Sequence, residues 1–300
     1  MKYLACPDDK SELYLDVPKR DEVVEGRFQC RECSKEFEIW NGSVNFLGPG
    51  KREYDPFLSI RDGRRTGFLI DLMQDAADRA SKVDEKKSAE IMQEATRQRY
   101  DCECYSGTWK IPQDIIKELK PYTSGLIIEG ACGPGEGLIK LRENIDCDFY
   151  IGIDISGKMV RKAQENARRL NRKGNRANML FVQGDIRYLP LTSGMTKIYM
   201  VNNAWDRVAQ PRKAAEEGKR ILSEDGSVIF SNCQPLQYES QDAGKNIINV
   251  PREERITLEE AVGLADCKPV LIREGYIWTV KTLLDGLENL PMKVVYGVRR

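Results

Sequence analysis

A glycine-rich turn at the end of an apolar run is the sharpest chemical signal in the sequence. Residues 126–137 read LIIEGACGPGEG, and the helical pattern LIKLREN follows. Glycine lets a chain bend sharply and lets backbone amides approach a ligand closely. The same turn could be a tight strand-to-helix connection that binds nothing, so the pattern alone is a weak indication of a ligand site.

Two aspartates stand at the ends of the next two strand-like runs. Asp154 ends FYIGID, and Asp185 follows MLFVQG. A carboxylate at the first place can accept both ribose hydroxyl hydrogens of an adenosine. One at the second place can contact the adenine amino group, with Ile186 packed on the ring. Either aspartate alone could be a helix N-cap, but three successive strand ends with suitable residues predict one site in the crevice of a doubly wound sheet.

The elements that must position these residues alternate from Gly125 onward, as in a doubly wound α/β sheet. A helical, highly charged region precedes them, and a long polar connection follows the fifth strand. We expect strands at 126–130, 149–154, 179–184, 197–203 and 226–232, helices at 111–120, 156–171, 210–222 and 256–267, and two late strands around 269–281 and 292–300. The expected units are residues 1–48, 49–122 and 123–300.

From about residue 110 onward, these blocks resemble the class I methyltransferases that depend on S-adenosylmethionine (SAM). EGACGPG is similar to the family's first motif, with Ala131 where its first glycine is usual, and IGIDIS and QGDIRYLPL are similar to its second and third motifs. The resemblance implies a Rossmann-like, seven-stranded sheet with SAM as cofactor. It implies cofactor contacts from Glu129, Gly130, Ala131, Gly133, Gly135, Asp154, Ile155, Ser156, Met159, Gly184, Asp185, Ile186 and Asn202. The rival interpretation is a nicotinamide-dependent dehydrogenase.

Composition narrows the function classes. The chain has no histidine, which excludes Ser-His-Asp triads and His-ligated metal centres. Basic and acidic residues both total 47, so bulk charge does not favour nucleic-acid binding. The start MKYLACPDDK lacks an apolar signal region, and no apolar run approaches the ~20 residues of a membrane span. With nine cysteines, an odd number, these features favour a cytoplasmic protein without a membrane partner.

The first 48 residues carry a possible metal site. Cys30 and Cys33 form a Cys-x-x-Cys knuckle, whereas Cys6 begins a Cys-x-x-Asp sequence that ends at Asp9. Tetrahedral zinc needs four ligands from two such turns. The layout, with its ending FEIWNGSVNFL, resembles the zinc-ribbon family of methyltransferase activator subunits and the ribbon that heads some rRNA methyltransferases. A ribbon that folds by packing without metal is the alternative.

The acceptor should bind just past the fourth strand of the sheet. The candidates for its catalytic contacts are Asn202, Asn203, Trp205, Asp206 and Tyr238. VNNAWDR lacks the Asn/Asp-Pro-Pro-aromatic motif of enzymes that methylate nucleobase amines. We therefore favour a small molecule or a protein side chain as acceptor, with an RNA base read through the ribbon as the alternative and a non-catalytic SAM-binding protein as a further one. The connection 234–255 is expected to close over the acceptor, and the helices over 64–100 either to cover the site or to brace the ribbon.

Overall fold

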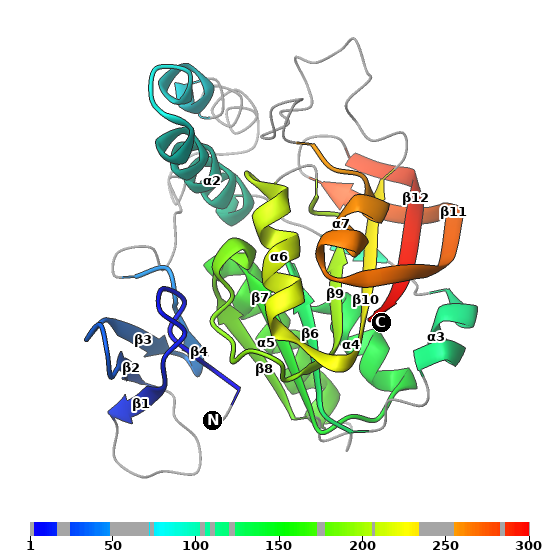
Figure 1. Ribbon diagram of the computed structural model, residues 1–300, viewed down its shortest axis with the longest axis horizontal. Helices are drawn as coiled ribbons and strands as arrows, with labels where there is room; N and C mark the ends of the chain where they lie inside the picture. The colour runs from blue at the N-terminus through cyan, green and yellow to red at the C-terminus, as the bar shows by residue number, and fades with distance from the viewer. Residues whose placement is uncertain are drawn as a thin grey trace.

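An eight-stranded mixed sheet forms the centre of the computed structural model (Figure 1). The structure describes residues 3–16, 25–48, 72, 75–102, 106–108, 112–119, 124–172, 178–205, 208–233, 255–282 and 286–299. The strands are β5 (Ser106–Thr108), β6 (Leu126–Gly130), β7 (Phe149–Asp154), β8 (Met179–Gln183), β9 (Thr196–Asn202), β10 (Leu222–Cys233), β11 (Cys267–Thr282) and β12 (Gly286–Arg299). Their order across the sheet is β5-β11-β12-β10-β9-β6-β7-β8.

The five strands from β10 to β8 are parallel, and β12 is antiparallel to both of its neighbours. Seven strands follow the doubly wound arrangement expected from the sequence, which confirms the predicted fold. The eighth strand, β5, was not predicted. It pairs antiparallel with β11, with Thr108 opposite Thr279, and it comes from the region expected to link the two domains.

Helices cover both faces of the sheet because side chains alternate along each strand. Ile128 of β6 packs in the same cluster as α6 (Pro211–Ile221) and α7 (Leu258–Leu264), whereas Ile127 packs in the cluster of α3 (Gln113–Leu119), α4 (Glu136–Asn144) and α5 (Gly157–Arg172). Every apolar side chain of β6 is fully buried. The helix α2 (Glu85–Cys102) lies beyond the carboxyl ends of the strands and contacts α5 (Figure 1).

A separate four-stranded antiparallel sheet precedes the helices, and we call residues 3–48 the ribbon. Its strands are β1 (Leu13–Asp16), β2 (Gly26–Cys30), β3 (Glu36–Trp40) and β4 (Ser43–Val44). Asn41 and Gly42 join β3 to β4 with φ of 51° and 75°, the two positive values that a type I′ hairpin needs.

The ribbon packs directly on the free edge of β8. The Phe46 amide donates to the Gln183 carbonyl at 2.8 Å, and the Ser43 hydroxyl donates to the Phe181 carbonyl at 2.9 Å. Three buried phenylalanines of the ribbon belong to the same apolar cluster as β6 and β7: Phe28, Phe37 and Phe46. The ribbon and the larger sheet therefore share one core.

Within the described ranges, no helix is both long enough and apolar enough to cross a membrane. Most of the connection 234–255 lies outside the described residues, so its predicted position over the acceptor stays a prediction.

Candidate functional site

A pocket that is partly open to solvent lies at the carboxyl ends of β6, β7, β8 and β9. This is the crevice in which doubly wound sheets bind ligands. Nine of the predicted cofactor residues line it: Glu129, Ala131, Gly133, Asp154, Ile155, Met159, Gly184, Ile186 and Asn202. The remaining four, which are Gly130, Gly135, Ser156 and Asp185, lie beside the pocket without lining it.

The turn after β6 brings backbone amides to the pocket. Its residues Ala131, Gly133 and Gly135 all have positive φ, at 52°, 52° and 76°. A Cβ at Gly135 would lie 2.8 Å from the Phe181 ring, so glycine is needed there for α4 to approach the sheet. Ala131 adopts the left-handed conformation in spite of its side chain, which shows that the turn keeps its shape without the usual first glycine.

Asp154 ties the turn to the end of β7. Its carboxylate accepts hydrogen bonds from the Gly133 amide at 2.8 Å and from the Ser156 amide at 2.9 Å. Only 7% of the residue is exposed, and it lines the pocket. The Ser156 hydroxyl in turn accepts from the Met159 amide at 3.2 Å, in the first turn of α5. Ser156 therefore holds Asp154 and Met159 in place without lining the pocket itself.

Glu129 is a buried carboxyl group between β6, α4 and β9. It accepts from the Leu138 amide at 2.8 Å and from the Asn202 Nδ2 at 2.7 Å. Burial raises its pKa to about 8, although both hydrogen bonds act in the opposite direction. The Asn202 Oδ1 accepts from the Ser231 hydroxyl at 2.9 Å, so the amide is fixed between two strands. A Cβ at Gly137 would lie 2.4 Å from Glu129 Oε1, and only glycine permits this packing.

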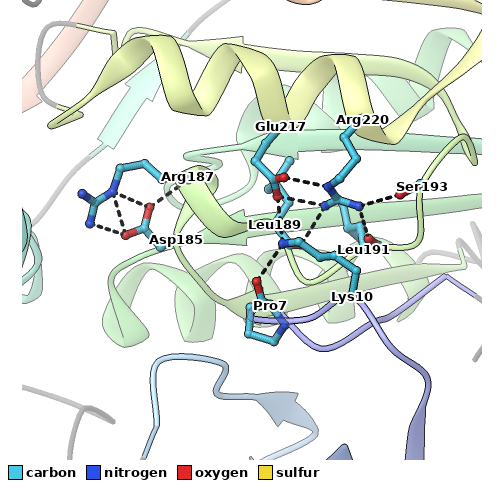
Figure 2. A network of polar contacts seen from close by, with 9 residues as sticks. All are labelled: Pro7, Lys10, Asp185, Arg187, Leu189, Leu191, Ser193, Glu217 and Arg220. Carbon is cyan, nitrogen blue, oxygen red and sulfur yellow. Dashed lines mark hydrogen bonds and ion pairs between the residues drawn. The ribbon is translucent and has the colours of Figure 1, made fainter. Parts of the chain in front are cut away.

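Asp185 has a different environment from the other carboxylates. Its carboxylate accepts a hydrogen bond from the Arg187 amide at 2.9 Å, and this bond caps the short helix η1 (Ile186–Tyr188). The same carboxylate pairs with the Arg187 guanidinium at 2.8 Å (Figure 2). Its neighbours Gly184 and Ile186 line the pocket. The predicted contact of Asp185 with adenine stays a prediction.

The predicted acceptor residues have three different positions. Asn202 and Asn203 line the pocket. Trp205 is 2% exposed and packs on Phe230, with 4.7 Å between ring centroids, so it is part of the core. Asp206 and Tyr238 lie outside the described residues.

Sequence reasoning left open whether the helices over 64–100 cover the site, and it named no pocket residue of α2. Gln93 and Thr96 of this helix are buried and line the pocket, and the Gln93 Oε1 accepts from the Ala209 amide at 3.1 Å, just before α6. Two polar residues spaced by three within an apolar stripe were the available signal. Lining residues that were also missed are Cys132, Pro134, Glu136, Gly137, Ala204, Val208 and Met292.

The ribbon gathers its predicted metal ligands at one point. One ligand atom each from Cys6, Asp9, Cys30 and Cys33 lies within 4.8 Å of the others. The Sγ atoms of Cys6 and Cys33 are 3.7 Å apart, close to the ~3.8 Å edge of a tetrahedron built with zinc–sulfur bonds of about 2.3 Å. The Cys30 Sγ lies 3.4 Å from Asp9 Oδ2. The donor set and spacing fit zinc.

The family model that matches the chain is a methyltransferase domain, over residues 125–266. No curated protein matches the sequence. Among solved structures, a SAM-dependent methyltransferase from Aquifex aeolicus is 18% identical, with 63% of this chain and 89% of that chain covered and a TM-score of 0.45.

Two further solved structures have similar scores. The geranyl diphosphate C-methyltransferase from Streptomyces coelicolor is 14% identical, with coverages of 62% and 79% and a TM-score of 0.47. A complex of the Haloferax volcanii Trm112 methyltransferase activator with a methyltransferase is 17% identical, with coverages of 62% and 87% and a TM-score of 0.45. The match of residues 125–266 identifies this part of the chain, which includes most of the pocket lining, as a methyltransferase domain.

Proposed function

We propose that the protein transfers a methyl group from SAM to a small molecule or to a protein side chain. The cofactor assignment is supported by one observation: the buried carboxyl groups of Asp154 and Glu129 line the pocket next to the glycine turn. Asp154 would hold the ribose hydroxyls, and Glu129 and the Gly133 region would face the amino-acid part of the cofactor. Ile155, Met159 and Ile186 would pack around the adenosine.

SAM supplies an electrophilic methyl group on a sulfonium. The residues of the chain then have to align the acceptor at about 3 Å from that methyl group and exclude water. The rigid Ser231–Asn202–Glu129 chain of hydrogen bonds suits this task, because it fixes an amide at the pocket wall. A strong base is needed only for an acceptor that is protonated at rest, so the absence of histidine is compatible with the reaction.

The acceptor class rests on the sequence. The chain has no net positive charge, and the motif of nucleobase amine methylation is missing after β9. The alternative acceptor is an RNA base, favoured by the resemblance of the ribbon to that of rRNA methyltransferases.

Replacement of Asp154 tests the cofactor assignment. Asp154→Ala should weaken SAM binding, measured by calorimetry, by about 1.5–3 kcal/mol, because it removes a charge-assisted hydrogen-bond acceptor. Asp146→Ala, at an exposed position after α4, is the matched control and should bind SAM as the original protein does. Unchanged affinity in Asp154→Ala would place the cofactor elsewhere.

A transfer assay tests the acceptor class. With SAM that carries a radiolabelled methyl group and a fractionated cell extract, label should enter small molecules or protein, and Asp154→Ala should abolish this. Strong labelling of purified rRNA or tRNA, lost in the same variant, would replace the proposal with the RNA alternative.

We also propose that the four-residue cluster of the ribbon binds one zinc ion. Cys6, Cys30, Cys33 and one Asp9 oxygen would be the ligands, since the other Asp9 oxygen accepts from the Ser11 amide at 3.0 Å. Zinc there would be structural, because the four positions of the tetrahedron would be filled by protein.

A further inference from the structure

Glu136 brings a third carboxyl group to the pocket. It stands at the first position of α4, directly after the glycine turn, and it is half-buried. Glu129 and Asp154, the other two carboxyl groups of the described lining, accept hydrogen bonds from backbone amides of the chain itself. Among the residues that the structure describes, none donates a hydrogen bond to Glu136 or forms an ion pair with it. Glu136 is therefore the one of the three whose carboxylate is not already bound by a backbone amide of the described residues.

The fold brings Glu136 close to Glu129. The next residue of α4, Gly137, packs so tightly that a Cβ there would lie 2.4 Å from Glu129 Oε1. The pKa of the Glu129 carboxyl is raised to about 8, first by burial and then by the charges of Asp154 and Glu136. Burial also raises the pKa of Glu136, whereas the charge of Lys140, one turn later, acts in the opposite direction. Carboxyl groups whose negative charge is disfavoured by burial and by each other are stabilised in the charged form by a cationic ligand group.

The cofactor offers such a cation in its amino-acid part. Glu129 and the Gly133 region are proposed to face this part, and Glu136 lies three residues after Gly133 and close enough to Glu129 to act on its charge. The amino-acid part carries one ammonium group and one carboxylate group. A carboxylate next to Glu136 would be repelled, whereas an ammonium group would gain a charge-assisted hydrogen bond with a partly shielded carboxylate.

We infer that Glu136 is a cofactor-binding residue whose carboxylate binds the α-ammonium group of SAM. The inference rests on the proposed function, and it adds a specificity-determining residue to the cofactor site. The protein should therefore select cofactors that carry a free ammonium group. A ligand without that group would leave the half-buried Glu136 carboxylate without a counter-ion, which is unfavourable.

Calorimetry with a pair of ligands and a pair of proteins isolates this contact. The ligands are S-adenosylhomocysteine (SAH) and its des-amino analogue, which keeps the carboxylate and lacks the ammonium group. The original protein should bind SAH at least ~10-fold more tightly than the analogue, as expected for a hydrogen bond between charged groups. In Glu136→Gln this preference should fall to less than ~3-fold, because the variant has no charge for the ammonium group to neutralise. An unchanged preference in Glu136→Gln would overturn the inference.

Two further variants and one further ligand separate binding from folding. Glu136→Asp keeps the charge and should retain more of the preference for SAH than Glu136→Gln does. Glu143→Gln makes the same change at an exposed position of α4 and should bind both ligands as the original protein does. 5′-Methylthioadenosine lacks the whole amino-acid part, so its affinity for all of these proteins should agree within about 2-fold. An equal loss of 5′-methylthioadenosine and SAH binding in Glu136→Gln would mean that Glu136 supports the structure of the pocket instead.

Failure of the inference and failure of the proposed function give different results. If the original protein binds neither SAM nor SAH, the proposed function is wrong. If it binds both and Glu136→Gln weakens SAM alone, the Glu136 carboxylate faces the sulfonium, and only its assignment to the ammonium group is wrong.

Discussion

Ala131 is a residue in a backbone conformation that favours glycine. Its φ of 52° lies in the left-handed region, at the point where the chain leaves β6 for the pocket. A side chain there costs about 1 kcal/mol or more, whereas glycine loses more entropy on folding. Ala131→Gly should therefore raise the free energy of unfolding by up to about 1 kcal/mol, measured with urea. Ala163→Gly, in the interior of α5, should lower it, and a loss of stability in both variants would contradict the strain argument.

Glu129 links the stability of the cofactor-free protein to pH. Its pKa is about 8 in the folded protein, compared with 4.5 for an exposed glutamate, because burial disfavours the charged form. Between these two values the folded state binds one proton more than the unfolded state. The free energy of unfolding should therefore decrease by a few kcal/mol as pH rises from about 4.5 to 8.

Glu129→Gln removes this titration while it keeps the shape of the side chain. Urea unfolding at pH 5 and pH 8 should show a smaller decrease for the variant than for the original protein. Equal decreases would mean that Glu129 is ionised in the folded protein throughout this range, contrary to its burial.

Some of these residues could be predicted from the sequence and others could not. Glu129, Asp154 and Ile186 follow apolar runs directly, so their common position at one sheet edge follows from the geometry of parallel strands. Gln93 lies some 36 residues before Glu129 on a separate helix, and only tertiary packing brings it to the pocket. Asp185 was predicted from its place at a strand end, but that place does not indicate its ion pair with Arg187, two residues away.

At the scale of elements, a cluster of charges joins the ribbon to α6 and to the segment after η1 (Figure 2). Lys10 of the ribbon lies 3.1 Å from Glu217 of α6, and Arg220 of the same helix lies 2.6 Å from it. Both cations also donate to the Leu189 carbonyl, at 3.3 Å and 3.0 Å. Burial would raise the pKa of Glu217, but hydrogen bonds from Arg220 and the charge of Lys10 lower it instead. The Glu217 carboxylate therefore holds two cations, and both cations bind the backbone of the segment after η1.

Glu217→Gln should lower the free energy of unfolding by about 1–3 kcal/mol, because two partly buried cations lose their common partner. Chemical denaturation measures the change. The control is Asp225→Asn, which breaks the pair with Lys197 at a side chain that is 67% exposed and should cost less than about 1 kcal/mol. Equal effects of the two variants would show that the cluster contributes no more than an exposed ion pair.

Elements with a strong periodic pattern could be placed from the sequence, and elements defined by their partner could not. The bounds of β6 and β7 agree with the predicted strands, and α5 differs from its prediction by one residue at each end. The short strands β4 and β5 were not predicted. A segment of two or three residues is too short to show the alternation that identifies a strand. These two strands form because β3 pairs with β4 and β11 pairs with β5.

At the scale of the whole molecule, the ribbon covers the outer edge of the larger sheet at β8. A free edge such as that of β8 presents unpaired backbone groups and invites association with other chains. The bonds from Phe46 to Gln183 and from Ser43 to Phe181 occupy this edge. Because Phe28 and Phe37 belong to the same apolar cluster as the sheet, the two parts should unfold together.

Removal of the proposed zinc ion should therefore destabilise the whole protein and not the ribbon alone. Protein purified without chelator should contain about one equivalent of zinc, and Cys33→Ser should lose it. Cys33 is exposed, so this variant leaves the core intact, and its single unfolding transition should be at least ~5 °C lower. Cys147→Ser, at a half-buried cysteine outside the cluster, should keep both the metal and most of the stability. Elemental analysis and calorimetry measure the two quantities. Less than about a tenth of an equivalent of zinc in the original protein would mean that packing alone holds the ribbon.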